Sequence, residues 1–256
     1  MKRRIDQLLV ERGLFDSRAR AQAAIAAGLV TVGGRVVAKP SEAVDEDAAI
    51  TAESAHPWVG RGALKLDHAL TLWPVPVEGR VVVDVGASTG GFTQVCLSRG
   101  ATRVYAVDVG RGQLHPTLAG DPRVVELSGT DARMLTPALI PRVPSLIVTD
   151  VSFIGLAKAL PAALALAGQG ADLVALVKPQ FEAGPGNVGK GGIVKDEAVR
   201  QAALASVVGW LESEGWPVRG TAESPITGGD GNREFLIWAR KGAWKRAARD
   251  ADGPSS

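Results

Sequence analysis

Short apolar runs separated by helix-patterned segments recur through the larger, carboxyl-terminal part of the chain. Runs of this kind are typical of buried parallel strands, and their alternation with helices predicts an α/β fold with a doubly wound sheet. The expected strands are Val81–Val85, Arg103–Val107, Val124–Leu127, Ser145–Thr149, Asp172–Val177, Val218–Ala222 and Arg233–Trp238. A long helix is expected at Glu197–Leu211.

The last two of these seven strands are joined only by the loop 223–232. A loop this short favours an antiparallel pair, so the final strand is expected to run against the others. Its first residues, including Glu234, would then lie at the edge where the parallel strands end. The pattern therefore predicts a Rossmann-like sheet of seven strands with the last one antiparallel.

Residues 1–52 have a different pattern. Helical spacing of apolar residues predicts helices at Ile5–Arg12 and Arg18–Ala27, and the turn Gly33-Gly34 between two apolar segments predicts a hairpin. A further short strand is expected at Ala48–Thr51. We expect a small α+β domain at 1–52, a linker at 53–62, a larger domain at 63–240, and a basic, flexible tail at 241–256.

Positive charge is concentrated at the amino-terminal end. The 256-residue chain has a formal net charge of only +2, yet its first 20 residues contain six Lys and Arg against three Asp and Glu. This distribution favours a polyanionic partner such as RNA, the alternative being an ordinary solvated basic surface.

Other compositional features exclude several classes. One cysteine, Cys96, excludes an internal disulfide and is expected in the core. The three histidines lack metal-ligand spacing, so no metal site is expected. With neither a signal peptide nor a membrane-length apolar run, a soluble, cytoplasmic protein is expected.

The first expected strand of the larger domain leads into a glycine-rich turn. Glycines let the backbone approach a ligand at the carboxyl end of a strand. Ser88 stands where a dinucleotide fingerprint requires glycine, which disfavours a dehydrogenase. The acidic-x-Gly-x-x-x-Gly pattern resembles the S-adenosylmethionine loop of class I methyltransferases, although such a turn can also merely pack a helix on a strand. The resemblance implies cofactor contacts from Asp84, Gly86, Ala87, Ser88, Thr89, Gly90, Gly91 and Phe92.

Acidic residues follow the next strands. Asp108 ends the second strand, where it can accept both ribose hydroxyls of an adenosyl ligand, and Asp131 follows the third, where it can reach the adenine amino group. Asp150 follows the fourth strand and is also expected to contact the cofactor. Phe153 is expected either against the adenosyl group or in the core.

Four ionisable residues are expected to converge at this edge. Asp150 and Lys178 follow the fourth and fifth strands, Glu234 begins the reversed strand, and Lys65 lies in the predicted helix that precedes the first strand. The alternative is solvated charge, which for Lys65 means an exposed basic helix face shared with Arg61 and His68.

Four sequence segments resemble the TlyA family. They are Arg-Gly-Ala-Leu-Lys-Leu (61–66), Asp-Val-Gly-Ala-Ser-Thr-Gly-Gly-Phe (84–92), Asp-Val-Ser-Phe-Ile (150–154) and Leu-Val-Lys-Pro-Gln-Phe-Glu (176–182). Lys65, Asp150, Lys178 and Glu234 also match the Lys-Asp-Lys-Glu tetrad of FtsJ-type 2′-O-ribose methyltransferases. Residues 1–52 resemble the RNA-binding domain of the ribosomal-protein-S-four type.

These resemblances span nearly the whole chain and imply an S-adenosylmethionine-dependent methyltransferase with a class I sheet, acting on a cytidine of ribosomal RNA. They imply that Lys178 steers and deprotonates the hydroxyl, that Asp150 and Glu234 hold the two lysines, and that Lys65 stabilises charge. Sequence alone does not separate the base from the electrostatic helper. The implied RNA contacts are Arg3, Arg4, Arg18, Arg20 and Arg61.

Two other functions stay open at this point. One is a non-catalytic RNA-binding or ribosome-assembly factor, which the complete tetrad and intact glycine loop disfavour. The other is membrane lysis, because the TlyA family also carries the label haemolysin; the lack of a spanning segment disfavours it. The expected partner is ribosomal RNA in subunits or ribosomes, without a membrane or a metal.

Overall fold

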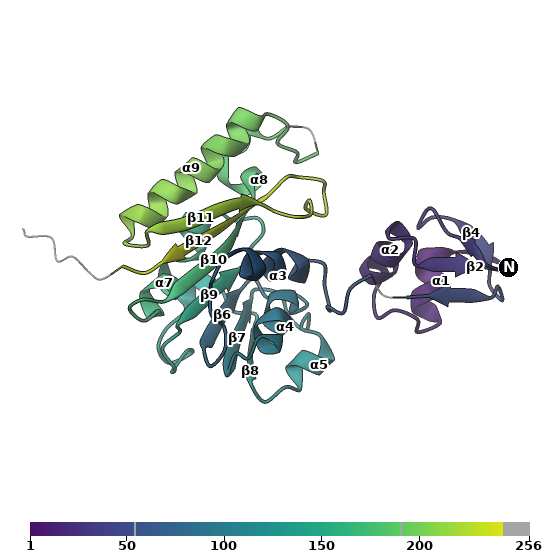
Figure 1. The fold of residues 1–256 in the computed structure, drawn as a ribbon, viewed down its shortest axis with the longest axis horizontal. Coiled ribbons are helices and arrows are strands. Elements are labelled where there is room, and N and C mark those ends of the chain that lie inside the picture. The colour runs from purple at the N-terminus through teal and green to yellow at the C-terminus, as the bar shows by residue number, and fades with distance from the viewer. Residues whose placement is uncertain (54, 190, 243–256) are drawn as a thin grey trace, which may run out of the picture.

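A seven-stranded sheet forms the centre of the larger domain (Figure 1). The computed structural model describes residues 1–53, 55–189 and 191–242. The strands are β6 (Val81–Val85), β7 (Arg103–Asp108), β8 (Val124–Ser128), β9 (Leu146–Thr149), β10 (Asp172–Val177), β11 (Val218–Glu223) and β12 (Phe235–Arg240). They lie in the order β11-β12-β10-β9-β6-β7-β8, and β12 runs antiparallel to both of its neighbours. The predicted sheet, with its last strand reversed, is confirmed.

Helices cover both faces of this sheet. They are α3 (Ala63–Leu72), α4 (Gly91–Ser98), α5 (Pro116–Ala119), α6 (Leu156–Ala159), α7 (Pro161–Leu166), α8 (Pro179–Glu182) and α9 (Glu197–Ser213), with 3-10 turns η1 (Ala132–Met134) and η2 (Pro185–Asn187). Because successive strand residues point to opposite faces, Val82 packs in the core with α3 and α4, whereas Val83 packs in the core with α7 and α9. Cys96 is fully buried on the α4 side, as predicted.

The amino-terminal domain has its own core. Its elements are β1 (Lys2–Arg4), α1 (Ile5–Glu11), α2 (Arg18–Ala26), β2 (Val30–Val32), β3 (Arg35–Val36), β4 (Ala43–Asp45) and β5 (Ile50–Ala52). Both predicted helices and the hairpin are confirmed. The antiparallel pair of β1 and β4 was not predicted, because three-residue strands with charged side chains carry no apolar pattern. The strand expected at 48–51 lies slightly later, at β5.

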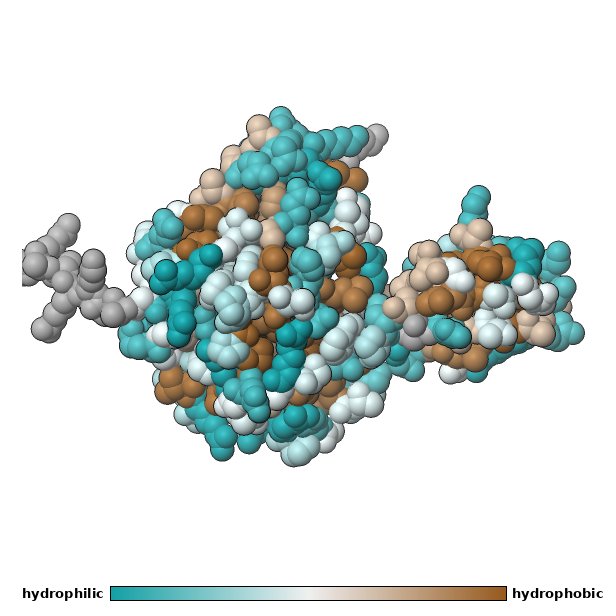
Figure 2. Space-filling model, in the orientation of Figure 1, coloured by the Kyte–Doolittle hydropathy of each residue, from teal (hydrophilic) through white to brown (hydrophobic). Residues whose placement is uncertain are grey.

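A narrow waist separates the two domains in the space-filling view (Figure 2). Asp16 of the small domain lies 3.4 Å from His115, just before α5 in the large one. Lys241 donates to the carbonyl oxygens of Leu164 and Ala167, and the rest of the predicted basic tail, 243–256, lies outside the described residues. No helix within the described ranges is both long enough and apolar enough to cross a membrane.

Candidate active site

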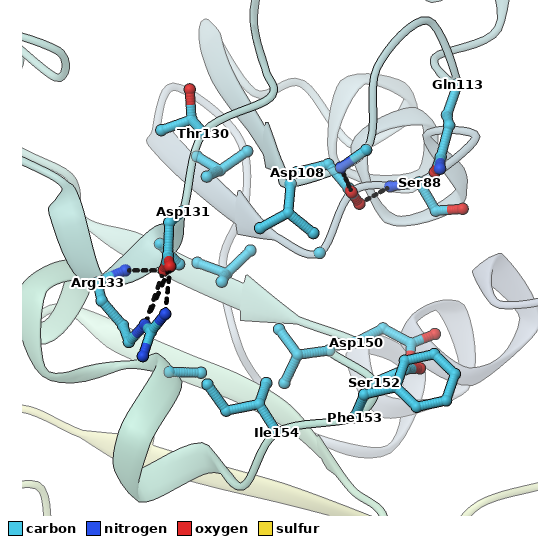
Figure 3. Close-up of a pocket in the computed structure, with 18 residues that line it drawn as sticks. Ser88, Asp108, Gln113, Thr130, Asp131, Arg133, Asp150, Ser152, Phe153 and Ile154 are labelled. Carbon is cyan, nitrogen blue, oxygen red and sulfur yellow. Dashed lines mark hydrogen bonds and ion pairs between the residues drawn. The ribbon is translucent and has the colours of Figure 1, made fainter.

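A pocket of about 510 Å³ opens at the carboxyl ends of β6, β7 and β9 (Figure 3). This is the edge at which open α/β sheets bind ligands, and the volume lies within the roughly 300–1,000 Å³ typical of small-molecule sites. Polar side chains reach the pocket from the loops after four successive strands of the sheet. They are Ser88, Asp108, Gln113, Thr130, Asp131, Arg133, Asp150 and Ser152.

Glycine-rich backbone forms one wall of the site. Gly86 has a φ of +84°, and a Cβ atom there would lie 3.1 Å from the backbone oxygen of Asp150. Ser88 has a φ of +48°, a left-handed conformation uncommon for a residue other than glycine. The loop can therefore pass close to the backbone after β9 only with glycine at position 86.

Asp108 is fixed at the end of β7. One of its carboxylate oxygens accepts a hydrogen bond from the backbone N–H of Ser88 at 2.8 Å, and the other accepts from that of Gly110 at 2.7 Å. A carboxylate has about four lone-pair positions, so both oxygens can still accept from a ligand. The arrangement suits two neighbouring hydroxyls, as a ribose presents.

Asp131 lines the pocket beside its own neighbour Arg133. The hydrogen bond from the Arg133 side chain, 2.5 Å long, lowers the pKa of Asp131 to about 2. Asp131 is therefore ionised at neutral pH and is shared between Arg133 and any donor that enters the pocket.

Phe153 stands at the pocket rim with 91% of its surface exposed. Its φ of +67° turns the ring outward, where its centroid lies 5.3 Å from that of Phe181. The alternative placement of Phe153 in the core is thus wrong. Its place at the rim is compatible with the predicted contact to an adenosyl group.

Asp84 does not reach the pocket. Strand alternation directs it to the α4 face, where it is fully buried and accepts a hydrogen bond from the Thr93 hydroxyl at 2.7 Å. Burial raises its pKa to about 7, against the opposing effect of the Thr93 hydrogen bond. The structure thus does not place Asp84 with the other cofactor candidates.

The four tetrad residues meet as two ion pairs. Lys178 Nζ lies 2.7 Å from Asp150 and donates to the Ser152 hydroxyl at 2.8 Å, while Lys65 Nζ lies 2.5 Å from Glu234. Lys65, Lys178 and Glu234 are all buried.

The two pairs also influence one another. Burial raises the pKa of Glu234, and the positive charges of Lys65 and Lys178 oppose that rise. The interpretation of Lys65 as part of an exposed helix face is wrong, since α3 buries it together with Leu66.

A second cavity, of about 380 Å³, lies between the two domains. Lys178, Asp150 and Ser152 form part of its lining, together with the glycine loop and residues 59–62. Asp150 also lines the larger pocket, so the two cavities adjoin. Lys65 and Glu234 line neither, which places their pair behind that of Lys178 and Asp150.

The arginines expected to bind RNA do not form one cluster. Arg4 and Arg18 share the buried carboxylate of Asp6. Arg3 pairs instead with Glu11 and Glu46, and Arg20 with Asp16. Arg20 and Arg61 both line the cavity between the domains, and Arg61 donates to the carbonyl oxygen of Thr227 at 3.3 Å.

Several lining residues were not singled out from the sequence. Ser152 and Arg133 each follow a predicted acidic residue by two positions, a spacing that could have identified them. Thr130 carries no such signal. Within the part of the chain that the structure describes, no group of three or more His, Cys, Asp and Glu could hold a metal ion.

Comparisons with known proteins agree with this geometry. Residues 58–241 match the family model of FtsJ-like methyltransferases, and residues 3–50 match that of the S4 domain. The 16S/23S rRNA (cytidine-2'-O)-methyltransferase TlyA of Mycobacterium tuberculosis is 47% identical, over 93% of this chain and 89% of that protein.

Solved structures show the same architecture. A structure from Streptococcus thermophilus that carries the name hemolysin has a TM-score of 0.75 and 40% identity, covering 94% of this chain and 89% of its own. An S-adenosylmethionine dependent methyltransferase from Mesorhizobium loti shares the fold, with a TM-score of 0.50 and 16% identity over 70% of this chain and 98% of its own.

Proposed function

This chain belongs to the TlyA family, with an S4 domain followed by an FtsJ-like methyltransferase domain, and we propose that it methylates the 2′-hydroxyl of a cytidine in ribosomal RNA. The methyl donor of this enzyme class is S-adenosylmethionine. The observation that carries the proposal is the Lys178–Asp150 pair, which lines a cavity adjoining the pocket that suits an adenosyl ligand.

The residues of the larger pocket fit the methyl donor. In the proposal, the two carboxylate oxygens of Asp108 accept from the ribose hydroxyls and Asp131 accepts from the adenine amino group, while Gly86 lets the loop after β6 pass close to the backbone after β9. When bound, S-adenosylmethionine would supply a methyl group on a sulfonium, whose carbon an oxygen nucleophile can attack in line as the carbon–sulfur bond breaks and S-adenosylhomocysteine leaves.

Lys178 is the tetrad lysine that faces the acceptor. Lys178 is buried and lies within electrostatic reach of the Lys65–Glu234 pair. In the proposal Lys178 steers and deprotonates the 2′-hydroxyl, and Asp150 holds Lys178 in place.

Lys65 lies behind the Lys178–Asp150 pair, farther from the cavity. Glu234 holds its ammonium group, and the positive charge stabilises the alkoxide that develops as the proton leaves. The reaction then needs the acceptor ribose aligned with the methyl group, which the walls of the cavity between the domains would provide.

The S4 domain would hold the RNA. Residues 1–52 form this domain in the proposal, 53–62 link it to the catalytic domain at 63–240, and the basic side chains Arg3, Arg4 and Arg18 contact phosphates. Arg20 and Arg61 lie at the cavity through which the acceptor would enter. A ribosomal substrate would place the enzyme in the cytoplasm.

The test uses purified protein, isotope-labelled S-adenosylmethionine and ribosomal subunits that lack the modification. We expect label to enter ribosomal RNA, and mass spectrometry of nuclease digests to identify 2′-O-methylcytidine. If wild-type protein binds the RNA but transfers no methyl group, a non-catalytic factor becomes the better interpretation.

Lys178→Ala tests the assigned role. Because general acid–base groups typically contribute about 10²–10⁴-fold, we expect transfer to fall by at least about 100-fold while cofactor binding, measured by calorimetry, changes little. Lys195→Ala, which removes an exposed lysine, is the matched control. Activity of Lys178→Ala close to wild type would dismiss the assignment.

A further inference from the structure

Two arginines of the S4 domain share one buried carboxylate. Asp6, in the first turn of α1, has no exposed surface. Its oxygens accept hydrogen bonds from Arg4 Nε at 3.1 Å and Nη2 at 3.2 Å, and from Arg18 Nη2 at 2.8 Å and Nε at 3.3 Å. Gln22 of α2 donates to the same carboxylate at 2.9 Å.

Each guanidinium is held on one side and open on the other. Asp6 is the only hydrogen-bonding partner of the guanidinium groups of Arg4 and Arg18 within the described ranges of the chain. The Asp6 carboxylate binds the Nε and Nη2 groups of each arginine, while the Arg4 side chain stays 45% exposed and the Arg18 side chain 51% exposed. The remaining N–H groups of both forks can therefore donate to a ligand in solvent.

Asp6 also lets two positive charges lie close together. Arg4 ends β1 and Arg18 begins α2, so the shared carboxylate joins separate elements and offsets the repulsion between the guanidiniums. The hydrogen bond from Arg4 keeps the pKa of Asp6 well below its ordinary value, so the carboxylate remains charged at neutral pH.

We propose that Asp6 is a positioning residue that holds Arg4 and Arg18 as a preformed pair of guanidiniums for the phosphodiester backbone of RNA. This rests on the proposed function, since it assumes that the S4 domain binds ribosomal RNA. Guanidinium forks match phosphate oxygens in shape and charge, and side chains already ordered lose less freedom on binding.

Exposed carboxylates contact the other two arginines expected to bind RNA in this domain. Arg3 pairs with Glu11, which is 46% exposed, and Arg20 pairs with Asp16, which is 56% exposed. Water and a phosphate can compete for such surface pairs, which hold their geometry weakly. Asp6 is out of reach of solvent, so Arg4 and Arg18 keep their positions when a phosphate binds.

In the key experiment, long-range attraction and positioning predict opposite changes in RNA affinity. Asp6→Asn removes a negative charge from a face that binds a polyanion, so long-range attraction alone predicts tighter RNA binding. Positioning predicts weaker binding, by about tenfold, because two rotamer-rich side chains lose their fixed geometry. The measurement is the dissociation constant for ribosomal RNA over a range of salt, where we expect the salt slope to fall by about one.

Methyl transfer gives a second readout. We expect KM for RNA to rise in Asp6→Asn with kcat nearly unchanged, because Asp6 lies outside the catalytic domain. In an Arg4→Gln/Arg18→Gln background, Asp6→Asn should weaken binding no further. Glu42→Gln, which removes the carboxylate partner of Arg35 in the same domain, is the matched control and should not weaken binding.

If Asp6→Asn does not fold, Asp6→Glu provides the same test. It keeps the charge but displaces the carboxylate by one methylene, so positioning predicts weaker binding and attraction alone predicts no change. Binding as tight as wild type in the folded Asp6 variant, or a further loss in the double-arginine background, would overturn the inference.

The outcomes also separate this inference from the proposed function. If the double-arginine variant binds ribosomal RNA as well as wild type, both the RNA face and the role of Asp6 are wrong. If that variant binds weakly and the Asp6 variant binds as tightly as wild type, only the role of Asp6 is wrong. The proposed methyl transfer to ribosomal RNA then still stands.

Discussion

Buried ionisable residues lie at the active-site edge of this protein and within its sheet. Lys65 and Glu234 are buried as a pair, so each provides the counter-charge that makes burial of the other tolerable. Asp84 has no such partner; it has one hydrogen bond from Thr93, and its second oxygen has no hydrogen-bond partner among the described residues. Its protonation should respond to pH near neutrality.

Asp84 makes stability depend on pH. Its pKa is raised from 3.8 to about 7 in the folded protein, so between these values the folded state binds a proton more tightly than the unfolded state. Stability contributed by the neutral acid is therefore complete below about pH 4 and is lost as pH rises to about 7, by up to about 4 kcal/mol.

Asp84→Asn should lack this loss. The free energy of unfolding of both proteins is measured with urea at several pH values. We expect the value for the variant minus that for wild type to rise between pH 4 and 7 and then to stay constant. A difference between the two proteins that is constant across this window would show that Asp84 is ionised in the fold.

At the scale of elements, the loops that follow β6 and β7 depend on two different properties of glycine. Gly90 has a φ of +94°, and a Cβ atom there would lie 2.3 Å from Leu118 and 2.7 Å from Leu114. Gly112 has a φ of +62° with open space around it. Position 90 thus needs both a left-handed backbone and the absence of a side chain, whereas position 112 needs only the backbone conformation.

Alanine at these two positions should separate the effects. Gly112→Ala should cost about 1 kcal/mol from the backbone conformation alone. Gly90→Ala adds overpacking, typically about 1–3 kcal/mol, and should also weaken cofactor binding because the loop must shift. Urea unfolding and calorimetric titration measure the two quantities. Equal losses at both positions would mean that Leu114 and Leu118 move aside freely.

The elements and the site were predictable to different extents. The central strands β6, β9 and β10 could be identified because each is a mostly apolar run, and the rule that ligands bind at carboxyl ends brought Asp108, Asp150 and Lys178 to one edge. Which acid pairs with which lysine could not be read from sequence, because the pair of Lys65 and Glu234 joins residues 169 positions apart.

Local backbone geometry explains the other differences. The left-handed conformations of Ser88 and Phe153 have no sequence signature, and one of them turns an aromatic ring out to solvent. Asp84 was assigned to the loop by motif, but strand alternation directs it toward α4. The cavity between the domains depends on how the S4 domain docks, which no local pattern encodes.

For the whole molecule, the decisive feature is that the two domains have separate cores. The core of the S4 domain contains residues from Ile5 to Ala52, and those of the catalytic domain begin with Trp58. The contact between Asp16 and His115 is a partly exposed pair, which is typically worth no more than about 1 kcal/mol. Each domain should therefore unfold by itself.

Differential scanning calorimetry should resolve two transitions, with the S4 domain unfolding first because a domain of about 50 residues buries only about 60% of its surface. A ribosomal RNA fragment should raise the temperature of the first transition, and S-adenosylmethionine that of the second. At 100 times its dissociation constant, each ligand should increase the free energy of unfolding of its domain by about 2.7 kcal/mol. Deleting residues 1–52 should leave the second transition in place. A single transition that both ligands raise would mean that the cavity between the domains couples them into one cooperative unit, in which the methyl donor and the RNA stabilise each other's binding site.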